Sequence, residues 1–152
     1  MGILQRMWNA PTSAERLLAG LADSAGRHRE LADRLARHAA LCVYPNVARG
    51  LVALVARQNE QARMLGAILR ERHVWSKLPR PAGAEGANNW ARIGGDLALT
   101  LELAREMNQQ ALHWEGIDPA VAARLRAIAV EDDRCLGELR ELALRCDPQA
   151  LD

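Results

Sequence analysis

Residues 45–54 read PNVARGLVAL and residues 119–128 read PAVAARLRAI, and these two stretches decide the fold. Aligned at an offset of 119 − 45 = 74, they share Pro, Val, Ala, Leu and Ala at equivalent positions. Proline is favoured as the first residue of a helix, because its fixed φ suits the helix and its missing N–H would have no partner there. We interpret the two stretches as equivalent helix starts in a duplicated unit, each opening the second helix of a helical hairpin.

Around these stretches, the periodicity of apolar residues predicts four helices. Apolar residues at alternating steps of three and four favour helices at about 12–42, 45–73, 89–115 and 119–146. The apolar stripe of the third helix starts at Trp90. Capping signals precede the first, third and fourth helices: Thr12 with Glu15, Asn88 or Asn89, and Asp118.

Residues 76–87, SKLPRPAGAEGA, form the long connector between the two hairpins. The turns near Tyr44 and Ile117 are short, so the helices on either side of each turn should pack as a hairpin. A helix of about 26 residues is ~39 Å long, and ~12 extended residues reach roughly 40 Å. The connector can therefore run the length of the bundle, and both a crossover topology and an up-down-up-down topology stay open.

The composition predicts a single all-α domain over residues 1–152. The chain is 49% hydrophobic, mostly through Ala and Leu, and it has no Phe and one Tyr. This mixture favours helix over strand, so the four segments should form an antiparallel four-helix bundle. Lys and Arg (20) nearly balance Asp and Glu (19), which gives no electrostatic reason to expect nucleic acid as a partner.

The sequence also bears on location. No apolar run approaches the length of a membrane span, and residues 1–11 lack the central apolar block of a signal peptide. Cys42, Cys135 and Cys146 are odd in number and form no CxxC pattern, which favours free thiols in a reducing compartment. We therefore expect a cytoplasmic protein that does not span a membrane.

A hairpin turn followed by Pro-x-Val-Ala-x-x-Leu resembles the rubrerythrin-like members of the ferritin-like superfamily. The resemblance implies a Glu-x-x-His motif on the second and fourth helices and a glutamate on the first and third, which together hold two metal ions in mid-bundle. At the motif positions this chain has Gln58-Asn-Glu-Gln61 and Asp132-Asp-Arg-Cys135. The inward mid-helix positions of the first and third helices hold Ala25 with His28 and Leu97 with Thr100. Because Gln, Thr and Ala offer no charge to neutralise and bridge two cations, we expect no working di-iron site and no cofactor.

The residues that replace the metal ligands should form one polar layer inside the bundle. Counting outward from each hairpin turn places six of them at similar heights: His28, Gln58, Gln61, Thr100, Asp132 and Cys135. In our first interpretation, Asp132 pairs with His28 in a hydrogen-bonded remnant, because a lone buried charge is costly. The second is a single-metal site of His28, Asp132 and Cys135, an N/O/S set that suits zinc or copper. The third is a small-ligand cavity beside Ala25, Gly26, Gly94 and Gly95.

Other polar residues are expected to have ordinary roles. His38, His73 and His113 lie near helix ends, where a histidine can interact with the last carbonyls or face solvent. Three acidic pairs lie off the apolar stripes and should be solvated: Glu30 with Asp33, Glu102 with Glu106, and Glu131 with Asp133.

Residues 2–9 form a predicted amphipathic segment with Ile3, Leu4, Met7 and Trp8 on one face. This face can cap the bundle end, dock on a partner protein or lie on a membrane surface, and Trp75 is a further candidate partner contact. The preferred hypothesis is a non-catalytic ferritin-like bundle that acts by association, as a self-assembling subunit or an accessory protein of a complex. The alternatives are a metal-binding protein or metal-dependent oxidoreductase with the His/Asp/Cys site, and a small-ligand-binding module.

Overall fold

The computed structural model describes residues 12–75 and 86–149, and every regular element in these residues is an α-helix. The helices are α2 (Ser13–Leu41), α3 (Pro45–Arg70), α4 (Asn89–Glu115) and α5 (Pro119–Ala143). The predicted all-helical bundle of four helices is therefore confirmed for the described residues. The predicted amphipathic segment 2–9 and most of the connector lie outside them.

The helix starts agree with the capping signals in the sequence. Thr12 and Glu15 make both bonds of a capping box, Asn88 accepts from the N–H of Ala91, and Asp118 accepts from the N–H groups of Ala120 and Val121. Two predicted helix ends were too late, because α3 ends at Arg70 and α5 ends at Ala143. Shortly after α3, His73 has a φ of 56°, a left-handed conformation with which a right-handed helix cannot continue.

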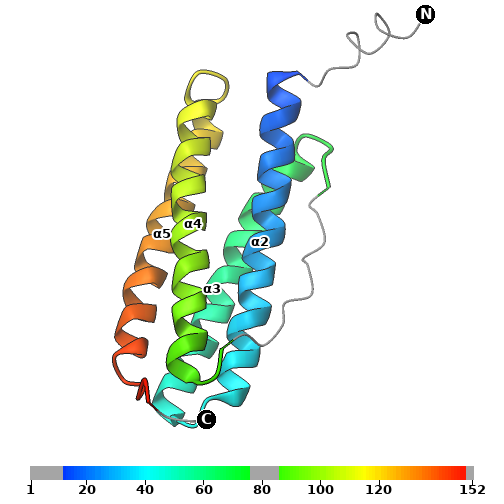
Figure 1. Ribbon diagram of the computed structural model, residues 1–152. Helices are drawn as coiled ribbons and strands as arrows, with labels where there is room; N and C mark the ends of the chain where they lie inside the picture. The colour runs from blue at the N-terminus through cyan, green and yellow to red at the C-terminus, as the bar shows by residue number, and fades with distance from the viewer. Residues whose placement is uncertain (1–11, 76–85, 150–152) are drawn as a thin grey trace, which may run out of the picture.

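Figure 1 shows the arrangement of the helices: α2 and α5 run from the top of the view to the bottom, whereas α3 and α4 run from the bottom to the top. α2 packs against α3 and α4, and α5 packs against the same two helices. The chain therefore leaves α3 at one end of the bundle and enters α4 at the other (Figure 1). Of the two topologies that the sequence left open, this order corresponds to the crossover.

The apolar core is divided into two clusters. One lies toward the α4–α5 turn and includes Leu21, Leu65, Met107 and Leu125. The other lies toward the α2–α3 turn and includes Leu35, Leu51, Ile93 and Leu139. The prediction that Trp90 starts the inward stripe of its helix was wrong, since its side chain is 48% exposed. The preceding residue, Asn89, takes the inward position and is 3% exposed, because it lies at helical spacing from Ile93.

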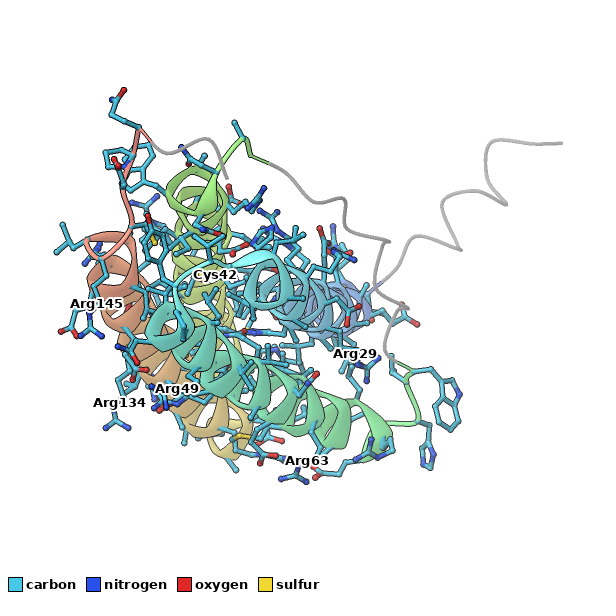
Figure 2. All side chains as sticks on the ribbon, turned by 90° about the horizontal axis from the view of Figure 1, so that it is seen from below. Arg29, Cys42, Arg49, Arg63, Arg134 and Arg145 are labelled. Carbon is cyan, nitrogen blue, oxygen red and sulfur yellow. The ribbon has the colours of Figure 1, made fainter. Side chains whose placement is uncertain are left out.

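Figure 2 shows the bundle along its axis, with side chains filling the space between the helices. The side chains of Arg49, Arg63 and Arg134 extend outward from α3 and α5 (Figure 2). Within the described residues, none of the helices has the length and apolarity needed to cross a membrane.

Candidate functional site

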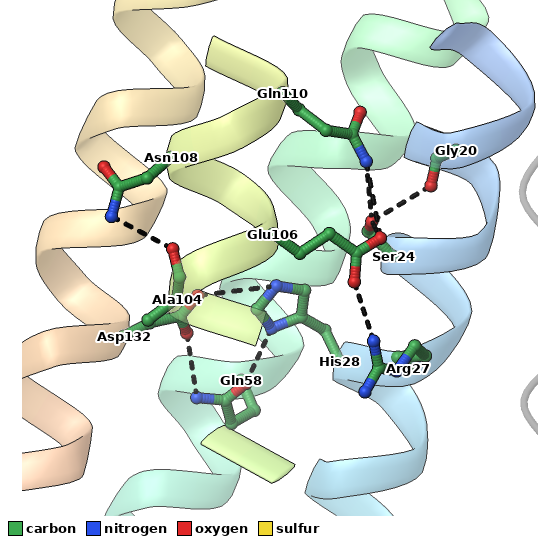
Figure 3. Close-up of polar contacts among 10 residues, drawn as sticks. All are labelled: Gly20, Ser24, Arg27, His28, Gln58, Ala104, Glu106, Asn108, Gln110 and Asp132. Carbon is green, nitrogen blue, oxygen red and sulfur yellow. Dashed lines mark hydrogen bonds and ion pairs between the residues drawn. The ribbon is translucent and has the colours of Figure 1, made fainter. Parts of the chain in front are cut away.

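Three of the predicted layer residues meet at the centre of the bundle (Figure 3). His28 of α2, Gln58 of α3 and Asp132 of α5 are each 0% exposed. The His28 Nδ1 lies 2.7 Å from the Gln58 Oε1, and the Gln58 Nε2 donates to the Asp132 Oδ1 at 3.5 Å. The His28 Nε2 and the Asp132 Oδ2 are 3.7 Å apart. The three side chains thus form a triangle that joins three helices.

The helical periodicity of the sequence places these side chains inside. Each of them lies three or four residues from buried apolar neighbours on its own helix, so it shares their face. The neighbours are Ala25 and Ala32 around His28, Leu54 and Ala62 around Gln58, and Ile128 and Leu136 around Asp132. Along each helix, the polar residue falls between the two apolar clusters.

The His28 imidazole is neutral at physiological pH. Burial lowers the pKa of His28 to about 4, and the nearby positive charge of Arg27 lowers it further, while the hydrogen bond to Gln58 works in the opposite direction. Because an amide oxygen only accepts, the imidazole proton is on Nδ1 and is donated to Gln58. The Nε2 is therefore an unprotonated acceptor that faces Asp132.

The Asp132 carboxyl keeps its proton at neutral pH. Burial raises the pKa of Asp132 to about 8, and the neighbouring charges of Asp133 and Glu131 raise it further. The hydrogen bond from Gln58, which is the largest effect after burial, and the amide of Gln61 lower this pKa. A protonated Oδ2 then faces the bare His28 Nε2, so each member of the triangle has one donor and one acceptor directed at the other two.

Gln61 and Cys135 are buried next to this triangle. Gln61 is 2% exposed, and its amide is near enough to Asp132 to lower that pKa. Neither the Gln61 Nε2 nor its Oε1 reaches hydrogen-bonding geometry with a partner in the described part of the chain. Cys135 is 1% exposed, and burial, with a contribution from Asp132, raises the pKa of its thiol to about 11. The thiol therefore stays protonated and packs in the apolar cluster near the α2–α3 turn.

The structure does not bring Thr100 into the layer. Thr100 is buried, but its hydroxyl donates to the backbone oxygen of Asp96 at 2.7 Å, within its own helix. Arg27, next to His28, pairs with Glu102 and Glu106 at 2.6 and 2.7 Å, so this part of α4 lies opposite the layer. The inward residue there is Ala104, one turn beyond Thr100. Thr100 and Ala104 both fit the helical spacing of the inward face. The packing of α4 on α2 determines which of the two residues lies at the height of the layer.

These side chains do not fit the two-metal group that the resemblance implies. Gln58 and Gln61 supply neutral amides, and Asp132 supplies a protonated carboxyl, so the layer lacks the negative charge that such ions require. In residues 12–75 and 86–149, no group of three or more His, Cys, Asp or Glu side chains is arranged to hold a metal ion.

A second buried polar cluster lies between α2 and α4, and the sequence pattern did not reveal it. Asp96 is 0% exposed, its Oδ2 lies 2.6 Å from the His38 Nδ1, and its Oδ1 accepts from the Arg34 Nε at 3.1 Å. His38 is 1% exposed, so the expected helix-end or surface role was wrong. The last turns of α2 are covered by α4, which buries a residue that would otherwise face solvent. His73 and His113 are exposed, as expected.

A third polar cluster corrects the expectation for Glu106. The Ser24 hydroxyl donates to the Glu106 Oε1 at 2.6 Å, and the Gln110 Nε2 donates to the Ser24 Oγ at 3.1 Å. The Glu106 side chain is only 25% exposed and also pairs with Arg27, so it belongs to the α2–α4 interface. Glu102 is 64% exposed, which agrees with a solvated position.

All three cysteines are free, with Cys135 and Cys146 buried and Cys42 half-buried. Two of the small residues proposed to line a cavity, Gly94 and Gly95, differ in their surroundings. A Cβ on Gly95 would lie 2.9 Å from the Arg34 Nη2, so there is little free space beside Gly95. A Cβ on Gly94 would meet nothing within 4 Å.

Comparison of this chain with protein-family models, curated proteins and solved structures gives no match.

Proposed function

We propose that the chain is a non-catalytic bundle of antiparallel, ferritin-like topology that acts by association, as a subunit of a homo-oligomer or an accessory protein of a complex. The observation that carries the proposal is the triangle of His28, Gln58 and Asp132, in which two hydrogen bonds join the three side chains. It lies in mid-bundle, and the resemblance implies that the family holds its two metal ions in mid-bundle as well. The crossover order of the helices supports the same class, because a ferritin-like bundle has one long connection of this kind.

Neutral groups in the triangle are suited to a structural role. A hydrogen-bonded histidine with a pKa near 4 and a protonated carboxyl supply neither an ionised base nor charges for cations at neutral pH. Their donors and acceptors are directed at one another, so the layer adds directional contacts to a core that is otherwise apolar.

Exposed apolar side chains at the ends of the bundle support association. Trp75, Leu112 and Ile117 are 81%, 69% and 52% exposed, and they belong to the end at which α3 and α4 finish (Figure 1). The described chain begins at the same end, with Thr12. Leu41, Val43 and Leu144 at the opposite end are 47%, 60% and 87% exposed, so apolar groups of the kind that is typical of protein contact surfaces lie at both ends of the bundle.

Element analysis of protein purified without chelators tests the non-catalytic part of the proposal. We expect no stoichiometric iron, zinc or copper. A metal present at one equivalent or more, and lost in Asp132→Asn but retained in a surface control such as Asp133→Asn, would refute the proposal and favour the His/Asp/Cys metal site.

Size-exclusion chromatography with light scattering tests association. We expect a mass above 16.7 kDa, or a stable complex with a defined partner, and we expect Trp75→Ser to weaken it. Leu144→Ser is a matched control, because Leu144 is 87% exposed but follows α5 at the opposite end of the bundle. A strictly monomeric protein without a co-purifying partner would argue against the proposal.

A further inference from the structure

We propose that two copies of this chain pair through the outer face of α3, with the two α3 helices antiparallel. α3 packs against α2 and α5, and its outer face points away from both. Along this face, side chains follow one another at alternating steps of three and four, the spacing with which one helix lies along another in a coiled coil. All six are exposed: Asn46, Arg49, Ala53, Ala56, Glu60 and Arg63.

The centre of the outer face of α3 is small and apolar. Ala53 and Ala56 are exposed, and Val52 beside them is 59% exposed. Small side chains let two helix axes approach closely, so the apolar atoms of both helices leave water together. Polar residues lie on either side of this centre, which is the arrangement of a protein interface.

The outer face of α3 is complementary to itself about a two-fold axis between residues 54 and 55. In an antiparallel pair related by this axis, Ala53 lies opposite Ala56 of the second copy, and Arg49 lies opposite Glu60 of the second copy. The symmetry makes each contact occur twice. A parallel pair would instead place like charges opposite one another at both positions. Exposed ion pairs contribute little affinity, but they select the antiparallel orientation.

Arg49 has no acidic partner in residues 12–75 and 86–149 of its own chain. Its guanidinium donates to the Asn46 side chain, and the Arg49 side chain extends outward from α3 (Figure 2). Glu60 pairs with Arg63 at 2.5 Å on its own helix, and a carboxylate has acceptor sites for a second guanidinium. Pairing of two copies therefore gives Arg49 a counter-charge and leaves the pair of Glu60 and Arg63 intact.

This interface is separate from the exposed apolar groups that support the proposed function. Trp75 and Leu144 lie beyond the helices at the two ends of the bundle, whereas Ala53 and Ala56 lie in the middle turns of α3. The α3 pairing therefore goes beyond the proposed function, since it names a second copy as the partner and a second surface as the contact. Each proposal can fail without the other.

Sedimentation equilibrium of the full-length, reduced protein from about 1 μM to about 1 mM tests the pairing. We expect a reversible dimer with twice the 16.7 kDa mass of one chain. Ala53→Glu should weaken the dimer at least about tenfold, because it brings two carboxylates into the apolar centre. Ala36→Glu is the matched control, because Ala36 is an exposed alanine on α2, and it should leave the dimer unchanged. Trp75→Ser should also leave this dimer unchanged.

Charge reversal tests the orientation of the two helices. Arg49→Glu and Glu60→Arg should each weaken the dimer about tenfold, since each places like charges opposite one another at both ends of the interface. The double variant Arg49→Glu/Glu60→Arg restores opposite charges across the two-fold axis. It should therefore form the dimer more tightly than either single variant.

Four results would overturn the α3 pairing. These are a monomer up to about 1 mM, equal effects of Ala53→Glu and Ala36→Glu, a double variant no tighter than the single variants, and a dimer that Trp75→Ser abolishes. The last result would leave the proposed function standing, and so would a monomer that co-purifies with another protein. A monomer without any partner would refute both proposals.

Discussion

Replacing Asp132 by Asn should change how the stability of the bundle depends on pH. Burial raises the pKa of Asp132 from an ordinary 3.8 to about 8 in the folded chain. Between these values, the folded chain binds one more proton at this residue than the unfolded chain does. The contribution of Asp132 to the free energy of unfolding therefore falls as the pH rises from about 4 to about 8. An asparagine has no such dependence.

His28 has the opposite effect over part of this range. Its pKa is lowered from 6.5 to about 4 on folding, so between these values the unfolded chain binds the extra proton and stability rises with pH. In the wild type, the contributions of His28 and Asp132 cancel between pH 4 and 6.5. Only the loss due to Asp132 remains between pH 6.5 and 8. At 1.36 kcal/mol per unit, these 1.5 units give a loss of about 2 kcal/mol.

The variant keeps only the contribution of His28. The pKa shift of His28 spans about 2.5 pH units, so the free energy of unfolding of the variant should rise by about 3 kcal/mol between pH 4 and 6.5. Above pH 6.5, His28 causes no further change. Other ionisable groups contribute equally to both proteins, so they cancel in the difference between variant and wild type. That difference should increase by roughly 1.4 kcal/mol per pH unit from pH 4 to pH 8.

Urea denaturation followed by circular dichroism measures both curves, at fixed protein concentration and ionic strength. A difference that stays constant with pH would refute the inference that the pair of His28 and Asp132 holds one proton across this range. An ion pair would hold the same number of protons, so the ¹⁵N chemical shifts of the His28 ring must decide where the proton lies. Two protonated ring nitrogens at pH 7 would refute the neutral triangle.

Four other substitutions and one labelling experiment test the packing. Asp96→Ala leaves the Arg34 guanidinium and the buried His38 imidazole without their shared partner and should lower the free energy of unfolding by about 3–5 kcal/mol in urea denaturation. Gln61→Met removes a buried amide that has no hydrogen-bond partner in residues 12–75 and 86–149, and it should raise the free energy of unfolding by about 1–3 kcal/mol. The new methyl group of Gly94→Ala faces open space within a helix, so this variant should have a higher melting temperature and a free energy of unfolding raised by up to ~1 kcal/mol. Gly95→Ala must displace a neighbouring arginine, so its free energy of unfolding should rise by less. Cys42 is half-buried and should react with a thiol reagent in the native protein well before the two buried cysteines.

The sequence predicts the helices well because their starts are local features. A capping box, an Asn or Asp cap and a leading proline depend on residues within one turn, so Thr12, Asn88 and Asp118 can be recognised without knowledge of the fold. The core triangle of His28, Gln58 and Asp132 is predictable for a similar reason, since each residue interrupts an apolar stripe.

The polar contacts between α2 and α4 are not predictable in this way. At several points a polar and an apolar residue are adjacent and both fit the helical spacing, as with His38 and Ala39 or Asp96 and Leu97. The sequence interpretation used the apolar one. A helix of a four-helix bundle buries a face wide enough for both, so the polar neighbour is also covered. Its partner lies on the other hairpin, far away in the sequence, and no local pattern identifies it.

The polar contacts between the two hairpins have a common role in the fold. Within each hairpin, a short turn sets the alignment of the two helices, but the long connector imposes no such alignment between the hairpins. Apolar packing is non-directional, so it does not by itself determine how far one hairpin slides along the other. Directional contacts do, and several of them join the hairpins: Arg27 with Glu106, His38 with Asp96, Arg57 with Glu138, and Gln58 with Asp132.

The position of these contacts explains why polar residues are retained in the interior of a chain with so apolar a core. A shift of one turn would leave Asp96 and Asp132 buried without their partners, which is far more costly than any gain in apolar contact. The polar clusters therefore select one alignment of the hairpins.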